Sequence, residues 1–149
     1  MDNTTTREII NYLGSHIRDI HARKMSVANI FAQDYSAYIH MLSFINTYIK
    51  RIESYIDGAN IKQGAPIMPF VLLGSFVHVA CDDGKICCFR VVLPQKKPLP
   101  DKQGVITVSC LECIGSLLLF RRVGEQVSVN EQEKQKMGMV QTIDFETQI

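Results

Sequence analysis

Residues 38–56 read YIHMLSFINTYIKRIESYI, and this stretch decides how the first half of the chain folds. Apolar residues recur in it at alternating intervals of four and three, at Tyr38, Leu42, Ile45, Ile49, Ile52 and Ile56. Such a heptad seam is typical of an α-helix that packs against a partner helix. The stretch therefore predicts one arm of a coiled coil.

A second apolar stripe lies upstream, at Ile10, Leu13, Ile17 and Ile20. Thr5 and Glu8 fit the capping box that begins a helix, and residues 5–57 contain no proline. A single helix of about 50 residues would be about 75 Å long and would leave its seam open in a monomer. An antiparallel hairpin, in contrast, folds one stripe onto the other within the chain.

The turn of this hairpin is expected between residues 23 and 36. The candidate caps of the second arm are polar residues whose side chains can accept a hydrogen bond from a helix N–H group, namely Ser26, Asn29 and Asp34. Residues 24–35 also suit a continuous helix, so a parallel coiled-coil dimer remains the alternative.

Asp57-Gly58 is expected to end the second arm, since glycine often follows a helix C-terminus. Residues 58–69 contain two glycines and two prolines and are expected to form a linker. The chain thus divides into a helical hairpin over residues 1–57, this linker, and a second domain over residues 70–149.

From Phe70 the apolar pattern changes to a period of two, which is typical of β-strands. Asp82-Asp83-Gly84 predicts a hairpin turn, because Asp-Gly tolerates the positive φ angles that such turns require. The expected elements are strands at 76–79, 86–93, 105–109, 126–130 and 139–145, a buried helix at 111–119, a proline-rich loop at 94–100 and a polar loop at 131–136. The predicted class is α+β, with the antiparallel helical hairpin followed by an antiparallel sheet and one short helix.

Composition restricts the functions that come into question. Lysine and arginine together number 16 and aspartate and glutamate 15, so no charge excess indicates nucleic acid as the main partner. The N-terminus lacks the basic and apolar regions of a signal peptide, and no apolar run approaches the ~18 residues of a membrane span. The five cysteines are an odd number with two adjacent, which disfavours a disulfide framework. We expect a cytoplasmic protein with reduced thiols.

Three motifs of the second half resemble the C-terminal domain of the Gre transcript-cleavage factors and of their relative, the regulator of nucleoside diphosphate kinase. Leu73-Gly74-Ser75-Phe76-Val77 is similar to the family's entry strand with Gly-Ser-x-Val, and Val123-Gly124-Glu125-Gln126-Val127 is similar to Val-Gly-Asp-x-Val. Residues 109–120 resemble the family's longer variant, Ser-Pro-x-x-Pro-Leu-Gly-x-Ala-Leu-Leu-Gly. In this chain the two prolines are replaced by Cys110 and Cys113 and the last glycine by Phe120. The motif set covers roughly residues 68–147 and is closest to the nucleoside diphosphate kinase regulator branch.

The resemblance implies an FKBP-like second domain and a bacterial RNA polymerase as the protein partner. In the family, that domain docks on the rim of the polymerase secondary channel and the coiled coil enters the channel. The residues that correspond to the family's polymerase contact are Ser109, Cys110, Leu111, Glu112 and Cys113. We add Arg121 and Arg122 to this expected docking surface because of the charge on the adjacent turn.

Cleavage factors hold a metal ion between two carboxylates at the tip of the coiled coil, and such hard cations prefer oxygen ligands. The close acidic pair of the helical half, Glu53 and Asp57, falls at the base of the predicted hairpin, and Asp34 has no acidic companion within four residues. Basic side chains are clustered near the expected turn instead, at Arg18, His21, Arg23 and Lys24. We therefore expect a non-cleaving regulator of transcription elongation with no catalytic residue, metal or cofactor. The basic cluster would supply tip contacts, or would be an ordinary solvated helix face.

Other interpretations remain open. Cys110 and Cys113 have the spacing of a zinc-binding pair, but a structural site needs four converging ligands, so we expect thiols packed in a reduced core. An FKBP-like fold would also suit a peptidyl-prolyl isomerase, which requires an apolar, aromatic-lined pocket. A third alternative is an oligomeric scaffold in which the heptad seam pairs two chains.

Overall fold

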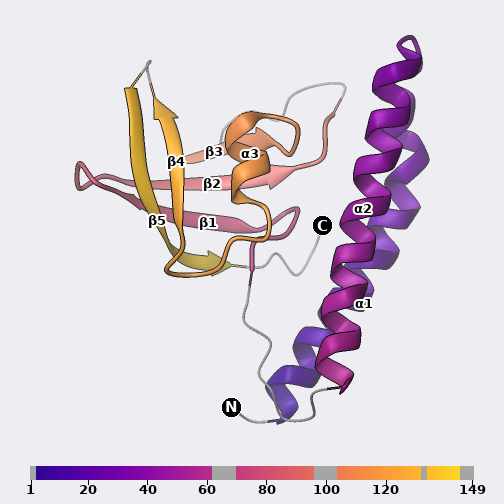
Figure 1. Ribbon diagram of the computed structural model, residues 1–149, viewed down its shortest axis with the longest axis horizontal. Helices are drawn as coiled ribbons and strands as arrows, with labels where there is room; N and C mark the ends of the chain where they lie inside the picture. Colours follow the sequence, from indigo (N-terminus) through magenta and orange to yellow (C-terminus); the bar gives the residue numbers. More distant parts are fainter. Residues whose placement is uncertain (1–2, 62–69, 96–103, 132–133, 145–149) are drawn as a thin grey trace. The chain divides into compact units, whose positions relative to one another are not determined.

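The computed structural model describes residues 3–61, 70–95, 104–131 and 134–144 (Figure 1). The chain divides into two compact units, Met1–Ile67 and Met68–Ile149. The first unit is helical and the second contains the sheet, as the change of apolar period predicts.

The first unit is an antiparallel helical hairpin, which confirms the predicted class. Helix α1 (Asn3–Ala28) is followed by a short 3-10 turn, η1 (Asn29–Phe31), and by α2 (Tyr35–Ile61). Asp34 is the cap of α2, because its Oδ1 accepts a hydrogen bond from the Ala37 N–H at 3.2 Å. Among the described residues, no helix is long and apolar enough to cross a membrane.

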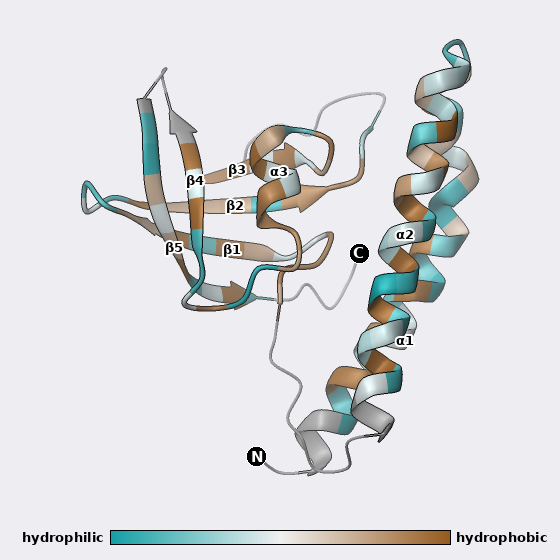
Figure 2. Cartoon of the chain, viewed as in Figure 1, coloured by the Kyte–Doolittle hydropathy of each residue, from teal (hydrophilic) through white to brown (hydrophobic). Residues whose placement is uncertain are grey.

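The two apolar stripes face each other inside this hairpin. Leu13 and Ile20 of α1 and Ile45, Ile49 and Ile52 of α2 are buried. Figure 2 shows apolar residues alternating with polar ones along both helices. The seam is thus covered within one chain and does not need a second chain, unlike in the parallel dimer that the sequence left open.

The ends of the hairpin differ from the prediction. Helix α1 begins at Asn3, upstream of the Thr5 capping box, and α2 continues through Gly58 to Ile61. Gly58 does not adopt the positive φ of a helix-ending glycine, so the helix continues and the first residues assigned to the linker are helical. The rest of the expected linker lies outside the described residues.

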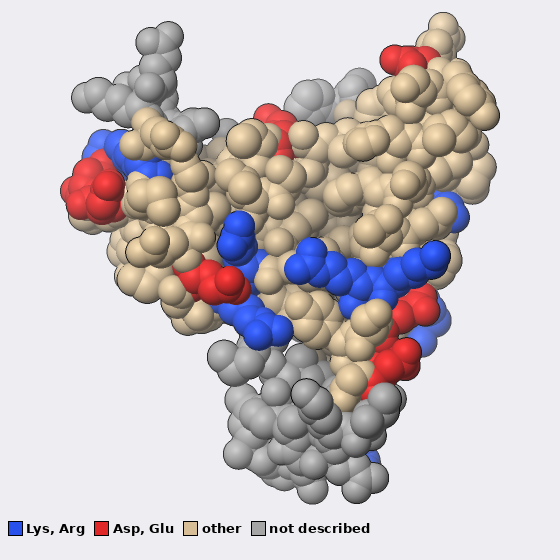
Figure 3. Space-filling view, in the orientation of Figure 1, with Lys and Arg blue, Asp and Glu red and all other residues tan. Residues whose placement is uncertain are grey.

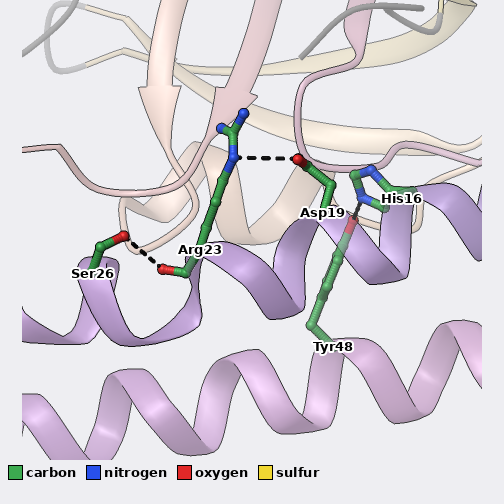
Figure 4. A network of polar contacts seen from close by, with 5 residues as sticks. All are labelled: His16, Asp19, Arg23, Ser26 and Tyr48. Atoms are coloured by element: carbon green, nitrogen blue, oxygen red, sulfur yellow. Dashed lines mark hydrogen bonds and ion pairs between the residues drawn. The ribbon is translucent and has the colours of Figure 1, made fainter.

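A polar network lies in the middle of the hairpin (Figure 4). The His16 ring is 2% exposed, and its Nε2 shares a hydrogen bond of 2.7 Å with the Tyr48 hydroxyl. Its Nδ1 is buried without a hydrogen-bond partner among the described residues. Burial lowers the pKa of His16 to about 4, while nearby Asp19 raises it and Arg23 lowers it. Asp19 and Arg23 themselves form an ion pair of 3.3 Å between positions four residues apart on α1, where both side chains are partly exposed.

The second unit is a curled five-stranded sheet with one helix. Its elements are β1 (Phe76–Cys81), β2 (Ile86–Val92), β3 (Val105–Ser109), α3 (Cys113–Leu118), β4 (Gln126–Glu131) and β5 (Lys134–Asp144). The strand order is β3-β2-β1-β5-β4. The Asp82-Asp83-Gly84 turn joins β1 and β2, with Gly84 at φ 86° and its N–H bonded to the Cys81 carbonyl at 3.0 Å. The predicted order of five strands and one helix is confirmed.

The sheet is mixed, so the prediction of a wholly antiparallel sheet is wrong for one pair. Strands β2 and β3 are parallel, with Phe89 opposite Ile106 and Val91 opposite Val108. Residues 93–104 connect these strands, and a connection of about a dozen residues is long enough to return the chain to the same end of the sheet. Of the predicted proline-rich loop at 94–100, residues 96–100 lie outside the described residues. Proline in general cannot donate to a strand ladder, but it does not set the direction of the next strand.

Strand β5 begins earlier than predicted. Residues 134–138 were expected to lie in or beside a polar loop, but they pair with β4 in the register Ser128 to Met137 and Val129 to Lys136. Figure 2 shows the start of β5 as hydrophilic. Backbone pairing with β4 satisfies the N–H and C=O groups of this segment whatever its side chains are, so polarity alone did not mark a loop.

The core of the second unit lies on one face of the sheet. Residues 77 and 79 of β1, Val91 of β2 and Val140 of β5 are fully buried, as is Leu118 of α3. The segment before β1 belongs to this core, since the Val71 N–H donates to the Arg121 carbonyl at 2.9 Å and the Phe120 N–H donates to the Val71 carbonyl at 2.8 Å. These two bonds fix the chain just beyond the end of α3.

Phe120 has a φ of 67°, the single positive value of a non-glycine residue in the described part of the chain. This is the position at which the resembled motif has its last glycine. An L-residue in this conformation is strained by about 1–2 kcal/mol. The ring of Phe120 lies 5.6 Å from that of Phe70, and this contact offsets the strain.

The Phe120 geometry gives the first prediction. Phe120→Gly and Phe120→Ala both remove the ring, but only alanine keeps the strain, so we expect the glycine variant to be the more stable by about 1 kcal/mol. Urea unfolding followed by circular dichroism measures the difference. At Ser116, a helical control position in α3, alanine should be more stable than glycine. Equal stabilities of the two Phe120 variants would contradict the strain.

The buried His16 gives a pH prediction. The unfolded state binds a proton near pH 6.5 and the folded state only near pH 4. Stability is therefore complete above pH 6.5 and is lost as the pH falls toward 4. Between pH 7 and pH 5 we expect the hairpin to lose about 2 kcal/mol of unfolding free energy. The helical signal in urea unfolding measures this loss.

Two variants separate His16 from other titrating groups. The double change His16→Leu with Tyr48→Phe replaces both hydrogen-bonding partners and should remove most of the pH dependence. The control, His21→Gln, changes an exposed histidine on the same helix and should leave the dependence as in the wild type. A pH dependence that persists in the double variant would contradict the assignment to His16.

Candidate functional site

The turn between β3 and α3, residues 109–113 (the Ser109–Cys113 turn), forms the first part of the expected docking surface. Ser109 organises it: its carbonyl accepts the Glu112 N–H at 3.0 Å and its Oγ accepts the Leu111 N–H at 3.2 Å. The Ser109 N–H in turn donates to Oε2 of Glu112. The serine and the glutamate thus hold each other, and the sequence Ser-x-x-Glu supplies both partners.

Gly115 permits this turn to lie against α3. A Cβ atom at this position would lie 2.0 Å from the Ser109 carbonyl oxygen and 2.9 Å from its carbonyl carbon. Only glycine fits beneath a backbone at that distance. The glycine of the second motif therefore has a structural reason, which is the close approach of helix and turn.

The five residues of the turn differ in what they present to a partner. Leu111, Glu112 and Cys113 are exposed, and Ser109 is half-buried. Cys110 is 1% exposed, and burial raises the pKa of its thiol to about 12. The Cys110 side chain therefore belongs to the core, which corrects its place among the expected contact residues: it can contribute only through its backbone.

A hollow of about 310 Å³ lies next to the turn. It is lined by the end of β2 and the residues that follow, by β3, and by the residue that precedes α3, namely Val92, Leu93, Pro94, Gln95, Thr107, Ser109 and Glu112. No pattern in the sequence predicted this hollow, because it arises from the parallel pairing of β2 and β3.

Arg121 and Arg122 lie at the opposite end of α3, which spans about 9 Å at its six residues. The Arg121 Nε donates to the Leu117 carbonyl at 2.8 Å, and its Nη1 lies 4.0 Å from Oε2 of Glu125. The Arg122 N–H donates to Oε1 of Glu125 at 2.7 Å. Both arginines are half-buried. Since Glu112 precedes α3 and the two arginines follow it, the helix has an acidic end at Glu112 and a basic end at Arg121 and Arg122.

The basic cluster of α1 does not form the hairpin tip. Helix α1 ends at Ala28, so Arg18, His21, Arg23 and Lys24 lie four to ten residues below its end, and the expectation that they are tip contacts is wrong in position. The Lys24 Nζ donates to Oδ1 of Asn46 on α2 at 2.6 Å, and Arg23 pairs with Asp19. Part of the cluster thus joins the two helices or is neutralised.

The tip consists of residues 29–34, with Tyr35 next to it at 77% exposure. From residue 25 to residue 49 the sequence has one charged side chain, Asp34, besides His40. Figure 3 shows this upper end of the hairpin as almost uncharged on the visible face. Two features of the sequence indicate the tip, namely Asp34 and the lack of lysine and arginine around it. The capping preference alone did not decide its position, because Ser26 and Asn29 suit the cap of a helix equally well.

Cys81 and Cys88 are poorly suited to redox chemistry at neutral pH. Burial and neighbouring Cys87 raise the pKa of Cys81 to about 11, and burial raises the pKa of Cys88. These thiols are therefore protonated and are poor nucleophiles. Within the described ranges, no three His, Cys, Asp or Glu side chains converge as a metal site would require.

Solved structures match most of the chain at low identity. GreA factor homolog 1 (Gfh1) of Thermus thermophilus is 20% identical over 90% of this chain and 93% of its own, with a TM-score of 0.45. Gfh1 of Thermus aquaticus gives 20% identity, 90% and 92% coverage, and a TM-score of 0.46. A transcription elongation factor GreA/GreB of Nitrosomonas europaea gives 17%, 63% and 79%, and 0.43. No protein-family model and no curated protein matches the chain.

The Gly115 contact gives the third prediction. Gly115→Ala should lower the unfolding free energy by about 1–3 kcal/mol and shift the amide resonances of Ser109 and Glu112, because the added methyl forces turn and helix apart. The matched control is Gly58→Ala, where a Cβ meets no atom within 4 Å and the helix should gain about 0.5–1 kcal/mol. Retained stability of Gly115→Ala would contradict the close approach.

Proposed function

We propose that this protein is a non-cleaving regulator of transcription elongation that binds bacterial RNA polymerase near its secondary channel. The second unit docks through the exposed part of the Ser109–Cys113 turn and through the basic end of α3. The hairpin occupies or modulates the channel. We further propose that, within the Gre family, the protein is nearest to the regulator of nucleoside diphosphate kinase and that it is cytoplasmic.

Support for the polymerase as partner comes from the three motifs together with the hairpin. Each motif lies at a turn that shapes the second unit: Gly74 and Gly124 have positive φ values, and residues 109–120 form the turn, α3 and the strained Phe120. Each of the three motifs therefore coincides with a turn of the described structure. The hairpin that precedes them is the other half of the family's layout.

The observation that carries the absence of cleavage is the single carboxylate at the hairpin tip. Asp34 caps α2, and residues 25–49 contain no second acidic side chain. One carboxylate cannot supply the paired oxygen ligands that a catalytic divalent ion needs at this place. The hairpin then acts by occupying space or contacting protein.

Neither alternative function has a specific observation in its favour. The described hollow beside the turn is lined by no aromatic residue, in contrast to the pocket expected of a peptidyl-prolyl isomerase. The heptad seam is buried inside the hairpin, so it is not left open to pair chains in a scaffold.

Polymerase binding and cleavage test the proposal in one experiment. We expect the purified protein to co-migrate with bacterial core RNA polymerase on gel filtration and to cause no transcript cleavage in stalled complexes. Reversing the charges with Arg121→Glu and Arg122→Glu should weaken binding about tenfold, equivalent to about 1.4 kcal/mol. Lys85→Glu, an exposed change at the β1–β2 turn, is the control and should bind as the wild type does.

The outcomes separate the parts of the proposal. Cleavage in the stalled complexes would overturn the non-cleaving role. Wild-type affinity of the arginine variant, with folding verified by circular dichroism, would remove Arg121 and Arg122 from the docking surface. Absence of wild-type binding at micromolar concentration would overturn the polymerase as partner.

A further inference from the structure

The hollow beside the Ser109–Cys113 turn has rigid walls, and the family resemblance implies no ligand for it. Its floor and walls come from elements that do not move independently, because the Cys110 N–H donates to the Val92 carbonyl at 2.9 Å and Val92 pairs with Ser109 in the parallel ladder. Glu112 closes one side and is fixed to Ser109 by hydrogen bonds in both directions.

Its lining combines an apolar wall with hydrogen-bond acceptors. Val92, Leu93 and Pro94 present aliphatic surface. The other lining residues are Gln95, Thr107, Ser109 and Glu112, whose side chains all carry oxygen acceptors. Such a combination suits a side chain with an apolar stem and a polar head that donates several hydrogen bonds.

The charge of the lining residues indicates whether the polar head of the bound side chain is a cation or an anion. Among the described lining residues, Glu112 is the one that carries a charge. A carboxylate repels phosphate and other anions and favours a cation. Because the turn already holds the Glu112 side chain, pairing with it costs little additional side-chain entropy.

Arginine fits this description better than other cationic groups. Its guanidinium offers five donors in a planar fork, which can bond a carboxylate and neighbouring hydroxyl or amide oxygens together, and its three methylene groups can lie on the aliphatic wall. A lysine presents a compact, strongly hydrated charge with fewer donors. A divalent ion would need more than one carboxylate among these ligands.

We propose that this hollow binds an arginine side chain of a protein partner, with Glu112 as the paired carboxylate. The inference deepens the proposed function and rests on it, since the partner is then the RNA polymerase to which the second unit docks. It adds a specificity contact, at the acidic end of α3, that is separate from Arg121 and Arg122 at the basic end.

Glu112→Gln in the full chain tests this contact. The glutamine oxygen can still accept the Ser109 N–H, so the turn is kept while the charge is removed. We expect this variant to bind core RNA polymerase about tenfold more weakly than the wild type. The matched control is Asp82→Asn, which makes the same charge change at the exposed β1–β2 turn and should bind as the wild type does.

A second measurement does not depend on the polymerase. Titrating the wild-type chain with N-acetyl-arginine amide should shift the backbone amide resonances of Ser109 and Glu112 saturably. N-acetyl-citrulline amide has nearly the same shape without the charge, and should shift them at least tenfold less at equal concentration. In Glu112→Gln the response to the arginine compound should fall to that of citrulline.

The two measurements distinguish failure of this inference from failure of the proposed function. If the wild type binds polymerase and Glu112→Gln binds equally well, the arginine contact is overturned and the proposed function stands. If the wild type does not bind polymerase, the proposed function is overturned and the titration decides. An arginine-specific, Glu112-dependent response then supports an arginine of a different protein, whereas equal responses to arginine and citrulline overturn the site.

Discussion

The second unit depends on the close contact between Gly115 and the Ser109 carbonyl, because this contact brings both ends of α3 into place. At the N-terminal end it lets the Ser109–Cys113 turn fold onto itself, with Ser109 and Glu112 as reciprocal hydrogen-bond partners. At the C-terminal end the chain leaves α3 through the strained Phe120 and returns to Val71 by two backbone bonds. A helix of six residues could not hold such an orientation by its own propensity. The surface proposed for docking is therefore a product of backbone packing, and its exposed side chains are fixed by that packing.

The hairpin buries a narrow apolar seam within one chain. Folding α2 onto α1 covers Ile45, Ile49 and Ile52, but it also buries His16 with one ring nitrogen unpaired among the described residues. A buried polar pair such as His16 and Tyr48 lowers stability relative to an apolar pair, and it disfavours shifted registers in which these groups lose each other. The charged side chains of the hairpin are outside the segment from 25 to 49, apart from Asp34. The end of the hairpin thus carries a single carboxylate and no lysine or arginine.

Periodicity predicted the helices, the strands and their order, because burial imposes a spacing on side chains that the sequence displays directly. It did not predict strand direction or extent. The parallel direction of β3 relative to β2 has no signature in the apolar pattern, and the polar start of β5 is held by backbone bonds to β4. Gly58 failed as a stop signal because a glycine ends a helix only when it adopts a positive φ. For the candidate site, the sequence predicted a turn at 109–113 with two arginines nearby, but not how exposed these residues are. Cys110 lies in the core, and the basic cluster of α1 lies below the tip. The hollow beside Glu112 exists only in the folded sheet.

The motifs that carry the family resemblance consist mainly of residues that the backbone conformation or the packing requires. Gly74, Gly115 and Gly124 meet backbone requirements, and Phe120 stands in a left-handed conformation where the motif has glycine. Phe120 keeps this conformation with its ring packed against that of Phe70. Each of these residues therefore has a structural reason within this chain, and the motifs say less about its activity. Differences in activity have to come from residues that the backbone and the core do not require. In this chain these are the hairpin tip, with its single charged residue Asp34, and the exposed side chains at the two ends of α3. A scaffold that keeps its turns while changing these two regions can retain a docking partner and lose a catalytic reaction, which is the combination we propose for this chain.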